Sequence, residues 1–309
     1  MTMTFNGAGV YMSGSNIEAV NNFIHDSARS GAVVFGNKNA IRNNTITTAA
    51  FDGIWLHGSN QVAESNDISG TVANPGSCLW RNIPSWFDAN GIDFEGDGQI
   101  IRGNQIHDIN GSDPRNSMDP HIDGLQMPQG SSNGSIIERN DISIPRYSVR
   151  CYQSGMFSGT IKNLTVRNNV VHDMCRGFNF LATVSGLSMA NNTFVNMDDY
   201  ATELDGDVQN PAVHNNIHYN ISHPYMRLGA VTSPDVGNNL AYQVQGSAYP
   251  GDLWGVDPKF VSLSGKDFHL QSASLARDAG LTLSIVADDK DGTPRPKGRR
   301  YDIGAFQYK

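Results

Sequence analysis

The chain has 309 residues, of which 39% are hydrophobic and only 17% charged, and its formal net charge at pH 7 is −8. This acidic balance argues against a nucleic-acid-binding protein, because phosphate backbones attract basic surfaces. No stretch reaches the roughly 18 apolar residues of a membrane-spanning helix, so we expect no membrane span. The first residues also lack the charged and apolar regions of a signal peptide.

A short unit recurs along the chain: an apolar residue, a polar gap, Asn, any residue and a second apolar residue. The aligned residues are Asn22, Asn44, Asn66, Asn104, Asn140, Asn169, Asn192, Asn215 and Asn238. Most intervals are 22 or 23 residues, and three are longer. Such a period with insertions predicts a solenoid in which each coil packs on the next. A repeated corner Asn can hydrogen-bond along the stack and tolerates a left-handed turn, which predicts an asparagine ladder.

A second recurring line predicts another strand in each coil. These lines begin at Gly9, Gly31, Gly53, Gly91, Gly124, Ser148, Gly177, Ala201 and Tyr225. Their apolar residues alternate by two, which excludes helical repeats, and the dense Leu consensus of leucine-rich repeats is missing. Alternation sends one set of side chains inward. That set is Ile54, Leu56, Ile92, Phe94, Leu125, Met127, Val149, Cys151, Phe178 and Phe180.

The other set points to solvent and forms two predicted columns. The first column is Tyr11, Val33, Trp55, Asp93, Gln126, Arg150, Asn179, Glu203 and Arg227, and the second is Phe35, His57, Glu95, Pro128, Tyr152, Leu181 and Asp205. Neighbouring rungs lie about 4.8 Å apart, so these columns predict one continuous strip. Two insertions, 69–89 and 107–123, precede strands of this strip, and long loops on a rigid scaffold commonly carry function.

The coil pattern over residues 9–245 resembles the pectate-lyase-like superfamily of right-handed parallel β-helix proteins. Its members include polysaccharide lyases, glycoside hydrolases, uronate epimerases and phage tailspikes. The ending, with Asp257-Pro258-Lys259-Phe260 and Asp302-Ile303-Gly304-Ala305-Phe306, resembles a segment common after bacterial β-helices. The resemblance implies an all-β solenoid of about nine to eleven rungs over 1–245 and a cap over 246–309 that covers the open end of the stack.

The same resemblance implies a secreted or cell-surface protein that cleaves an acidic, uronic-acid-containing polysaccharide by β-elimination. We expect a monomer, because the sequence shows no coiled coil or trimerising tail. Asp119-Pro120-His121 also resembles the DPH motif of mannuronan C5-epimerases, although Asn116-Ser117-Met118 replaces the aromatic-Gly-Phe stretch that usually precedes it. The substrate-binding residues that we expect are Trp55, His57, Gln126, Arg176, Glu203, Asp205, Trp80 and Trp86.

Four residues are expected to carry the chemistry of elimination. Arg150 matches a substrate carboxylate through its planar fork. His121 suits general acid or base work, and Tyr152 is placed to donate to the leaving oxygen. Asp123 is expected to take part in catalysis and, with Asp93 and Glu95, to supply oxygens to Ca²⁺.

Other interpretations of these residues stay open. The acids can be solvated surface groups or partners of Arg150. A glycoside hydrolase would need two carboxyl groups, for which the candidates are Asp93, Glu95, Asp123, Glu203 and Asp205. A uronate epimerase, or a carbohydrate-binding spike or adhesin without catalysis, fits the same fold, because a fold does not by itself specify an activity.

Overall fold

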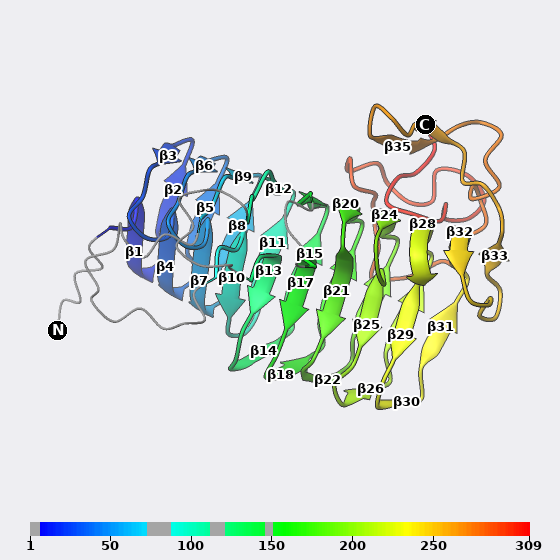
Figure 1. Cartoon of the computed structure of the whole chain (residues 1–309), viewed down its shortest axis with the longest axis horizontal. Helices are drawn as coiled ribbons and strands as arrows, with labels where there is room; N and C mark the ends of the chain where they lie inside the picture. The colour runs from blue at the N-terminus through cyan, green and yellow to red at the C-terminus, as the bar shows by residue number, and fades with distance from the viewer. Residues whose placement is uncertain (1–6, 73–87, 112–120, 146–150) are drawn as a thin grey trace.

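The computed structural model describes residues 7–72, 88–111, 121–145 and 151–309. Over these ranges the chain winds into an elongated parallel β-helix, with the first coil at one end and the C-terminal segment beside the last coils (Figure 1). No helix in these ranges has the length and apolar character needed to cross a membrane.

Three long parallel sheets run the length of the stack. Sheet 1 contains β1 (Val10–Ser15), β4 (Ala32–Asn37), β7 (Ile54–Ser59), β10 (Ile92–Glu95), β13 (Asp123–Met127), β17 (Gln153–Phe157), β21 (Arg176–Phe180), β25 (Thr202–Leu204) and β29 (Met226–Leu228). Sheet 2 contains β2 (Glu18–Val20), β5 (Ala40–Arg42), β8 (Val62–Glu64), β11 (Ile100–Arg102), β15 (Ile136–Glu138), β19 (Thr165–Arg167), β23 (Ser188–Ala190), β27 (Ala212–His214) and β31 (Asp235–Gly237).

Sheet 3 completes each coil and continues furthest toward the C-terminus. It contains β3 (Phe23–His25), β6 (Thr45–Thr47), β9 (Asp67–Ser69), β12 (Gln105–His107), β16 (Asp141–Ser143), β20 (Val170–Met174), β24 (Thr193–Met197), β28 (Ile217–Pro224), β32 (Leu240–Gln245) and β33 (Leu253–Trp254). A short fourth sheet contains β14 (Ser131–Asn133), β18 (Thr160–Lys162), β22 (Thr183–Ser185), β26 (Val208–Gln209) and β30 (Val231–Thr232). Strand pairing therefore reaches Trp254, beyond the boundary expected at residue 245.

The alternation read from the sequence holds along most of sheet 1. Ile54 and Leu56 are fully buried, and they pair with Ile92 and Phe94 on the next coil. The coil after β13 is the exception, because its strand is Gln153–Phe157 and not the line beginning at Ser148. The inward assignment of Cys151 in that line is therefore wrong, and Val149 lies outside the described residues.

The asparagine ladder occupies the corner between sheets 2 and 3. Each Nδ2 donates to the Oδ1 of the Asn on the next coil, as in Asn66 to Asn104 at 2.9 Å and Asn104 to Asn140 at 3.0 Å. In the last two coils the ladder uses Asn216 and Asn239, not Asn215 and Asn238 as predicted. The predicted pair instead holds the left-handed turn, with φ of 58° and 57°.

The C-terminal segment packs on the flank of the solenoid. Phe260, Phe268 and Ile303 form a core with Val195 and Leu240, which are the outward residues of sheet 3. Two short antiparallel strands, β34 (Phe260–Ser262) and β35 (Asp267–Leu270), belong to this cap. This part of the predicted cap segment therefore lies on a flank of the solenoid and not over its open end.

The end of the stack is closed by the first residues of the predicted cap segment. Tyr249 and Trp254 pack against the main core, and Asp252 Oδ1 accepts the backbone N–H of Asn239 at 2.9 Å. Because Asp252 takes the place of a further Asn, it terminates the ladder.

Candidate functional site

A row of polar residues begins the strands of sheet 1 in the middle of the stack. Asp123 pairs with Gln153, and Gln153 pairs with Arg176 on the following coil. The register of β7, β10 and β13 places Asp52 and Asn90 in the same row. Parallel stacking thus brings together side chains that lie some thirty residues apart in sequence.

Two amides join the acids of this row to the outward residues of sheet 1. Asn90 Nδ2 donates to Asp52 Oδ1 at 3.1 Å and to Gln126 Oε1 at 2.6 Å. Gln126 Nε2 donates to Asp88 Oδ2 at 3.1 Å, and Asn90 Oδ1 accepts the backbone N–H of Asp123 at 3.0 Å. These hydrogen bonds hold the carboxyl groups in position, but a neutral amide does not cancel the charge of a carboxylate.

Two acids of this cluster, Asp93 and Asp52, have pKa values above the usual range of an aspartate. Burial, reinforced by the charges of Asp52 and Glu95, raises the pKa of Asp93 well above its usual range. Burial likewise raises the pKa of Asp52 to about 7, although the hydrogen bond from Asn90 opposes this. Asp93 Oδ1 has no hydrogen-bond partner among the described residues. Asp93 therefore keeps its proton to a higher pH than an ordinary aspartate.

A histidine and a buried carboxylate form a pair on the coil that follows Asp93. His121 Nδ1 lies 3.1 Å from Asp123 Oδ2, and the Asp123 side chain is fully buried while that of His121 is 33% exposed. Burial raises the pKa of Asp123, and the hydrogen bond from His121 opposes the rise. Gln153 Nε2 donates to His121 Nε2 over 3.4 Å. A carboxylate on Nδ1 fixes the tautomer that leaves Nε2 as a proton acceptor.

Aromatic side chains cover the N-terminal end of the same face. Phe35 packs edge-on against Trp55 at 5.3 Å and His57 at 5.0 Å between ring centroids, and Tyr11 adjoins Phe35 at 6.1 Å. His57 forms an ion pair with Glu95 on the next coil. The predicted neighbours Trp55, His57, Asp93 and Glu95 are therefore brought together, and flat apolar rings of this kind suit sugar rings.

Charged residues occupy the C-terminal end of this face. Arg176 contacts Asp199 through Nε at 2.7 Å and Glu203 through Nη1 at 3.2 Å. Arg227 contacts Glu203 at 3.3 Å and Asp205 at 3.4 Å. The predicted substrate-binding residues Arg176, Glu203 and Asp205 thus share one cluster, three to four coils from Asp93 in the strand order of sheet 1.

The position predicted for Tyr152 is wrong. Its side chain is 2% exposed and belongs to the main core, because the strand starts at Gln153. The position beside Gln126 in the outward column is held by Met156 and not by Arg150. Arg150, Trp80, Trp86, Asp119 and Pro120 lie outside the described residues.

Asp52, Asp88, Asn90 and Gln153 were missed by sequence reasoning. A signal for two of them was present, since the residue before the strand-opening Gly is polar in successive coils: Ser30, Asp52, Asn90 and Asp123. The two outward columns predicted from the sequence begin after that Gly. Of the row before it, only Asp123 was therefore predicted as a site residue.

The carboxyl groups do not form a ready cation site. Within the described ranges, no three His, Cys, Asp or Glu side chains are arranged to hold a metal ion. The set Asp93, Glu95 and Asp123 thus does not fit a calcium centre in this arrangement. The dependence on calcium expected from the sequence is left to a chelation experiment, and no step proposed below uses a cation.

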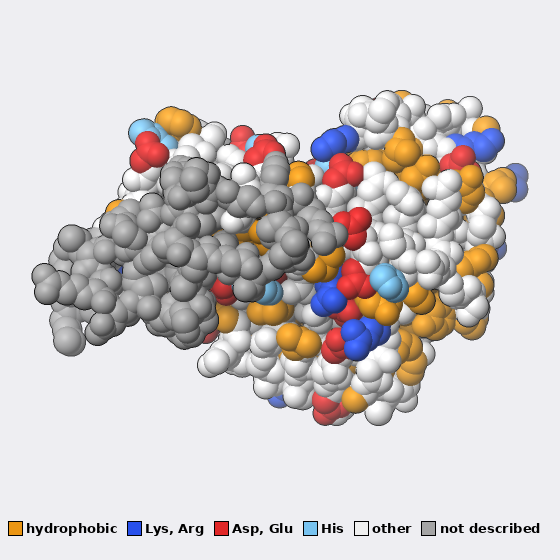
Figure 2. All heavy atoms as spheres, viewed as in Figure 1, with side chains coloured by type: hydrophobic (Ala, Val, Ile, Leu, Met, Phe, Trp, Pro, Cys, Tyr) orange, Lys and Arg blue, Asp and Glu red, His pale blue; other side chains and the backbone are white. Residues whose placement is uncertain are grey.

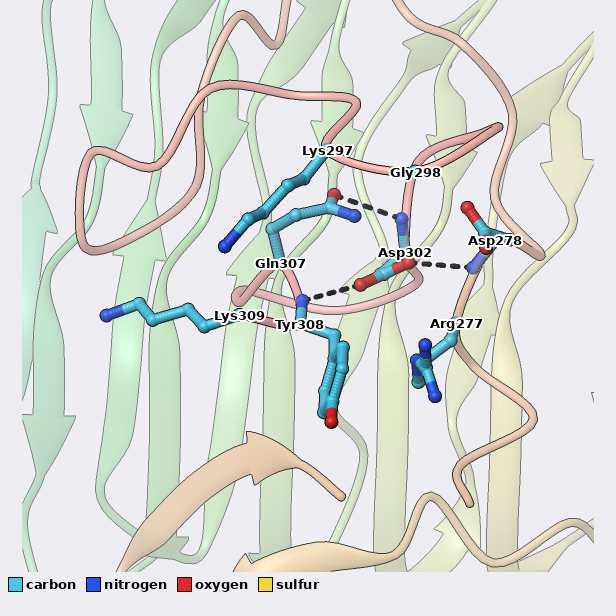
Figure 3. Close-up of a pocket in the computed structure, with 8 residues that line it drawn as sticks. All are labelled: Arg277, Asp278, Lys297, Gly298, Asp302, Gln307, Tyr308 and Lys309. Atoms are coloured by element: carbon cyan, nitrogen blue, oxygen red, sulfur yellow. Dashed lines mark hydrogen bonds between the residues drawn. The ribbon is translucent and has the colours of Figure 1, made fainter. Parts of the chain in front are cut away.

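A hollow in the cap is a separate feature. Figure 3 shows Arg277, Lys297 and Lys309 around it, with the Asp302 carboxylate accepting the backbone N–H groups of Asp278 and Tyr308. Because both Asp302 oxygens hold the chain in place, we assign this acid a structural role.

Comparisons with known proteins agree with the architecture. Residues 2–111 match the family described as a right handed beta helix region. The chain resembles the structure of pectate lyase Pel9A, with a TM-score of 0.56 and 17% identity over 97% of this chain and 72% of that one. The xylose complex of XylC matches with a TM-score of 0.49 and 11% identity over 91% of this chain and 50% of that one. No curated protein sequence matches the chain.

At these identities the likeness establishes the fold. The chain is a right-handed parallel β-helix, and the all-β solenoid expected from the sequence is confirmed. What the face of sheet 1 does chemically has to be argued from its own residues.

Proposed function

We propose that the protein cleaves an acidic polysaccharide, laid along the face of sheet 1, by β-elimination. The observation that carries this proposal is the pair of His121 and buried Asp123 on the coil next to that of Asp93, whose pKa is raised by burial. A base oriented by a carboxylate and a nearby protonated acid are the two groups that an elimination needs. The aromatic residues at the N-terminal end would receive neighbouring sugar rings.

The reaction begins with the proton on C5 of a uronate unit. His121 Nε2 accepts that proton, and the electron pair of the C5–H bond forms the C4=C5 double bond. The C4–O bond breaks, and Asp93 donates its proton to the leaving oxygen. Asp123 stabilises the resulting imidazolium without itself taking the proton. Neutralisation of the substrate carboxylate is the role proposed for Arg150.

Asp93 takes over the acid role that the sequence assigned to Tyr152. Tyr152 is buried in the core, whereas Asp93 is an outward residue of β10 and is only half-buried. The hydrogen bonds made by Asn90 and Gln126 hold the surrounding acids in position around Asp93.

A panel of uronic-acid polymers tests the reaction type. β-Elimination leaves a C4=C5 double bond conjugated with the carboxylate, so the expected result is new ultraviolet absorbance that grows with each cleavage. New reducing ends without absorbance would instead establish hydrolysis. Binding without any product would establish an adhesin-like role.

Hydrolysis is the second candidate, and one observation favours it. Asp93 and Glu95 project from the same strand on the same face, and the charge of Glu95 contributes to the raised pKa of Asp93. A protonated acid beside a second carboxyl group is the pair that glycoside hydrolases use.

We also propose that the protein works outside the reducing cytosol, as a secreted or cell-surface protein. Cys151 and Cys175 form a disulfide that joins consecutive coils next to the polar row. Disulfides persist mainly in oxidising compartments. The third cysteine, Cys78, lies outside the described residues.

A further inference from the structure

The charged cluster at the C-terminal end of sheet 1 is built around one buried acid. Figure 2 shows basic, acidic and histidine side chains gathered over β21, β25 and β29. Glu203 on β25 is paired in register with Asn179 on β21 and Arg227 on β29. Its side chain is only 1% exposed.

Two guanidinium groups hold the two oxygens of Glu203. Arg176 Nη1 lies 3.2 Å from Oε2, and Arg227 Nη1 lies 3.3 Å from Oε1. Oε2 receives no hydrogen bond from any described residue, so its contact with Arg176 is an ion pair alone. Arg176 is anchored on its other side by Asp199, through Nε and Nη2, both at 2.7 Å.

Arg227 is the more exposed of the two arginines of the cluster. Half of its side chain is exposed, and its guanidinium lies over the ring of Tyr200, 5.8 Å from the centroid. Its remaining ion pair, with Asp205 at 3.4 Å, is long. An exposed guanidinium on an aromatic ring presents a planar fork for a carboxylate from outside.

We propose that Arg227 and Arg176 form a binding subsite for a sugar carboxylate, and that proton uptake by Glu203 accompanies the binding. This inference rests on the proposed function, because it names how the same face recognises an acidic polysaccharide. The subsite that binds the sugar carboxylate lies at the opposite end of the face from the aromatic residues. The polymer would then lie in one direction along the stack.

Proton uptake follows from the charges that face Glu203. The cluster contains two positive charges, on Arg176 and Arg227. Three acids, Glu203, Asp199 and Asp205, pair with them, so the negative groups outnumber the positive ones before any substrate binds. Two further ionisable residues belong to the cluster: His223, with Nδ1 3.2 Å from Asp199 Oδ1, and Tyr200, whose ring packs against His223 and Arg227. A further carboxylate from the substrate adds another negative charge, and neutralising Glu203 removes one.

The environment of Glu203 points the same way. Burial raises its pKa, Arg176 opposes that rise, and Asp199 and Asp205 add to it. A substrate carboxylate on Arg227 would raise this pKa further. By linkage, the carboxylate then binds more tightly as the pH falls, by up to about tenfold per pH unit for one coupled proton.

Titration calorimetry on the full chain tests this subsite. The background variant is His121→Ala, which prevents turnover. The probes are hexamers of galacturonate and of mannuronate, each compared with its carboxyl-reduced, uncharged counterpart, from pH 5 to pH 8. Measurements in buffers of different ionisation enthalpy give the number of protons taken up.

We expect the uronate hexamer to bind more tightly at pH 5 than at pH 8, with proton uptake, and the reduced hexamer to show neither effect. Arg227→Ala should weaken uronate binding by about tenfold or more and leave the reduced hexamer unaffected. Glu203→Gln should bind tightly at every pH without proton uptake. Arg299→Ala, an exposed arginine of the cap, is the matched control.

Three results would overturn the subsite. They are unchanged uronate binding in Arg227→Ala, proton uptake that persists in Glu203→Gln, and proton uptake that disappears only in His223→Gln. The proposed function fails separately. If the wild type yields no product while pH-dependent, Arg227-dependent binding is present, the elimination is wrong and the subsite stands.

Discussion

The asparagine ladder and the polar row of sheet 1 are built from similar residues and behave in opposite ways. In the ladder, Asn104 Oδ1 accepts from the backbone N–H and the side chain of Asn66, and its own Nδ2 is bound twice. In the row, Asp93 Oδ1 and Asp123 Oδ1 have no hydrogen-bond partner among the described residues. Satisfied polar groups stabilise a stack, whereas unsatisfied acids destabilise it.

This difference separates structure from function on the same solenoid. A polar column that repeats in every coil and closes its own hydrogen bonds holds the coils together. A cluster confined to a few coils, with acids kept from their ordinary ionisation, is a candidate for chemistry.

The largest expected effect is on turnover. Replacing His121 by Ala, or Asp93 by Asn, should lower kcat on a uronan by about 10² to 10⁴, because each removes a proton-transfer group. Asp93→Asn should not lower the melting temperature, since burial disfavours the ionised form of Asp93 in the folded protein. Product absorbance and thermal unfolding are the measurements.

The control for this pair is Asp97→Asn, an exposed acid of the same coil. It should leave turnover and melting unchanged. Wild-type turnover in Asp93→Asn would remove this residue from the mechanism.

The next effect is on stability, in the ladder. Asn104→Ala should lower the free energy of unfolding by about 3 kcal/mol, because it leaves several buried groups without partners. Asn37→Ala is the matched control: its Oδ1 accepts from Asn60 at 3.1 Å on the exposed edge of sheet 1. We expect a change within about 0.5 kcal/mol there. Equal effects in urea unfolding would contradict the comparison.

His218 sharpens the comparison, because it is an unsatisfied group inside the core. It stacks between Phe194 and Tyr225, neither ring nitrogen has a described partner, and burial lowers its pKa to about 3. The unfolded chain therefore binds more protons below pH 6.5, and stability is lost as the pH falls from there toward 3.

Between pH 7 and pH 5 the loss from His218 should be about 2 kcal/mol. His218→Phe should remove it, and urea unfolding at the two pH values measures the difference. If the variant keeps the full acid sensitivity, other groups are responsible for it.

Chelation is expected to have the smallest effect. Because no three described side chains form a cation site, EDTA should leave turnover within about twofold, far below the loss expected from removing a proton-transfer group. Loss of activity that only Ca²⁺ restores in the wild type would instead establish a dependence on calcium.

The strand register of sheet 1 shows for which coils the sequence was sufficient to place the strand. Coils with two inward apolar residues, such as Ile92 and Phe94, were placed correctly because alternation of two identifies the buried face. The coil of β17 was misplaced because its inward position is Gly155. A Cβ on Gly155 would lie 2.7 Å from the Phe178 ring and 2.8 Å from that of Phe157. The aromatic rings fill the space that an apolar side chain would have marked.

The adjacent asparagines of the last coils show a second limit. In the pairs Asn215-Asn216 and Asn238-Asn239, either residue fits the ladder by spacing alone. Backbone conformation decides between them, since the first of each pair takes the positive φ. Only the stacked corner fixes which amide points along the ladder.

The sequence by itself determined the coil period, the buried face and the set of outward residues that holds Asp93, Glu95 and Glu203, because these depend on local alternation and repetition. The tertiary structure decided which acids meet, which are buried and which side chain begins each strand. Those properties depend on coils separated by insertions of different length, and packing between coils sets their relative phase.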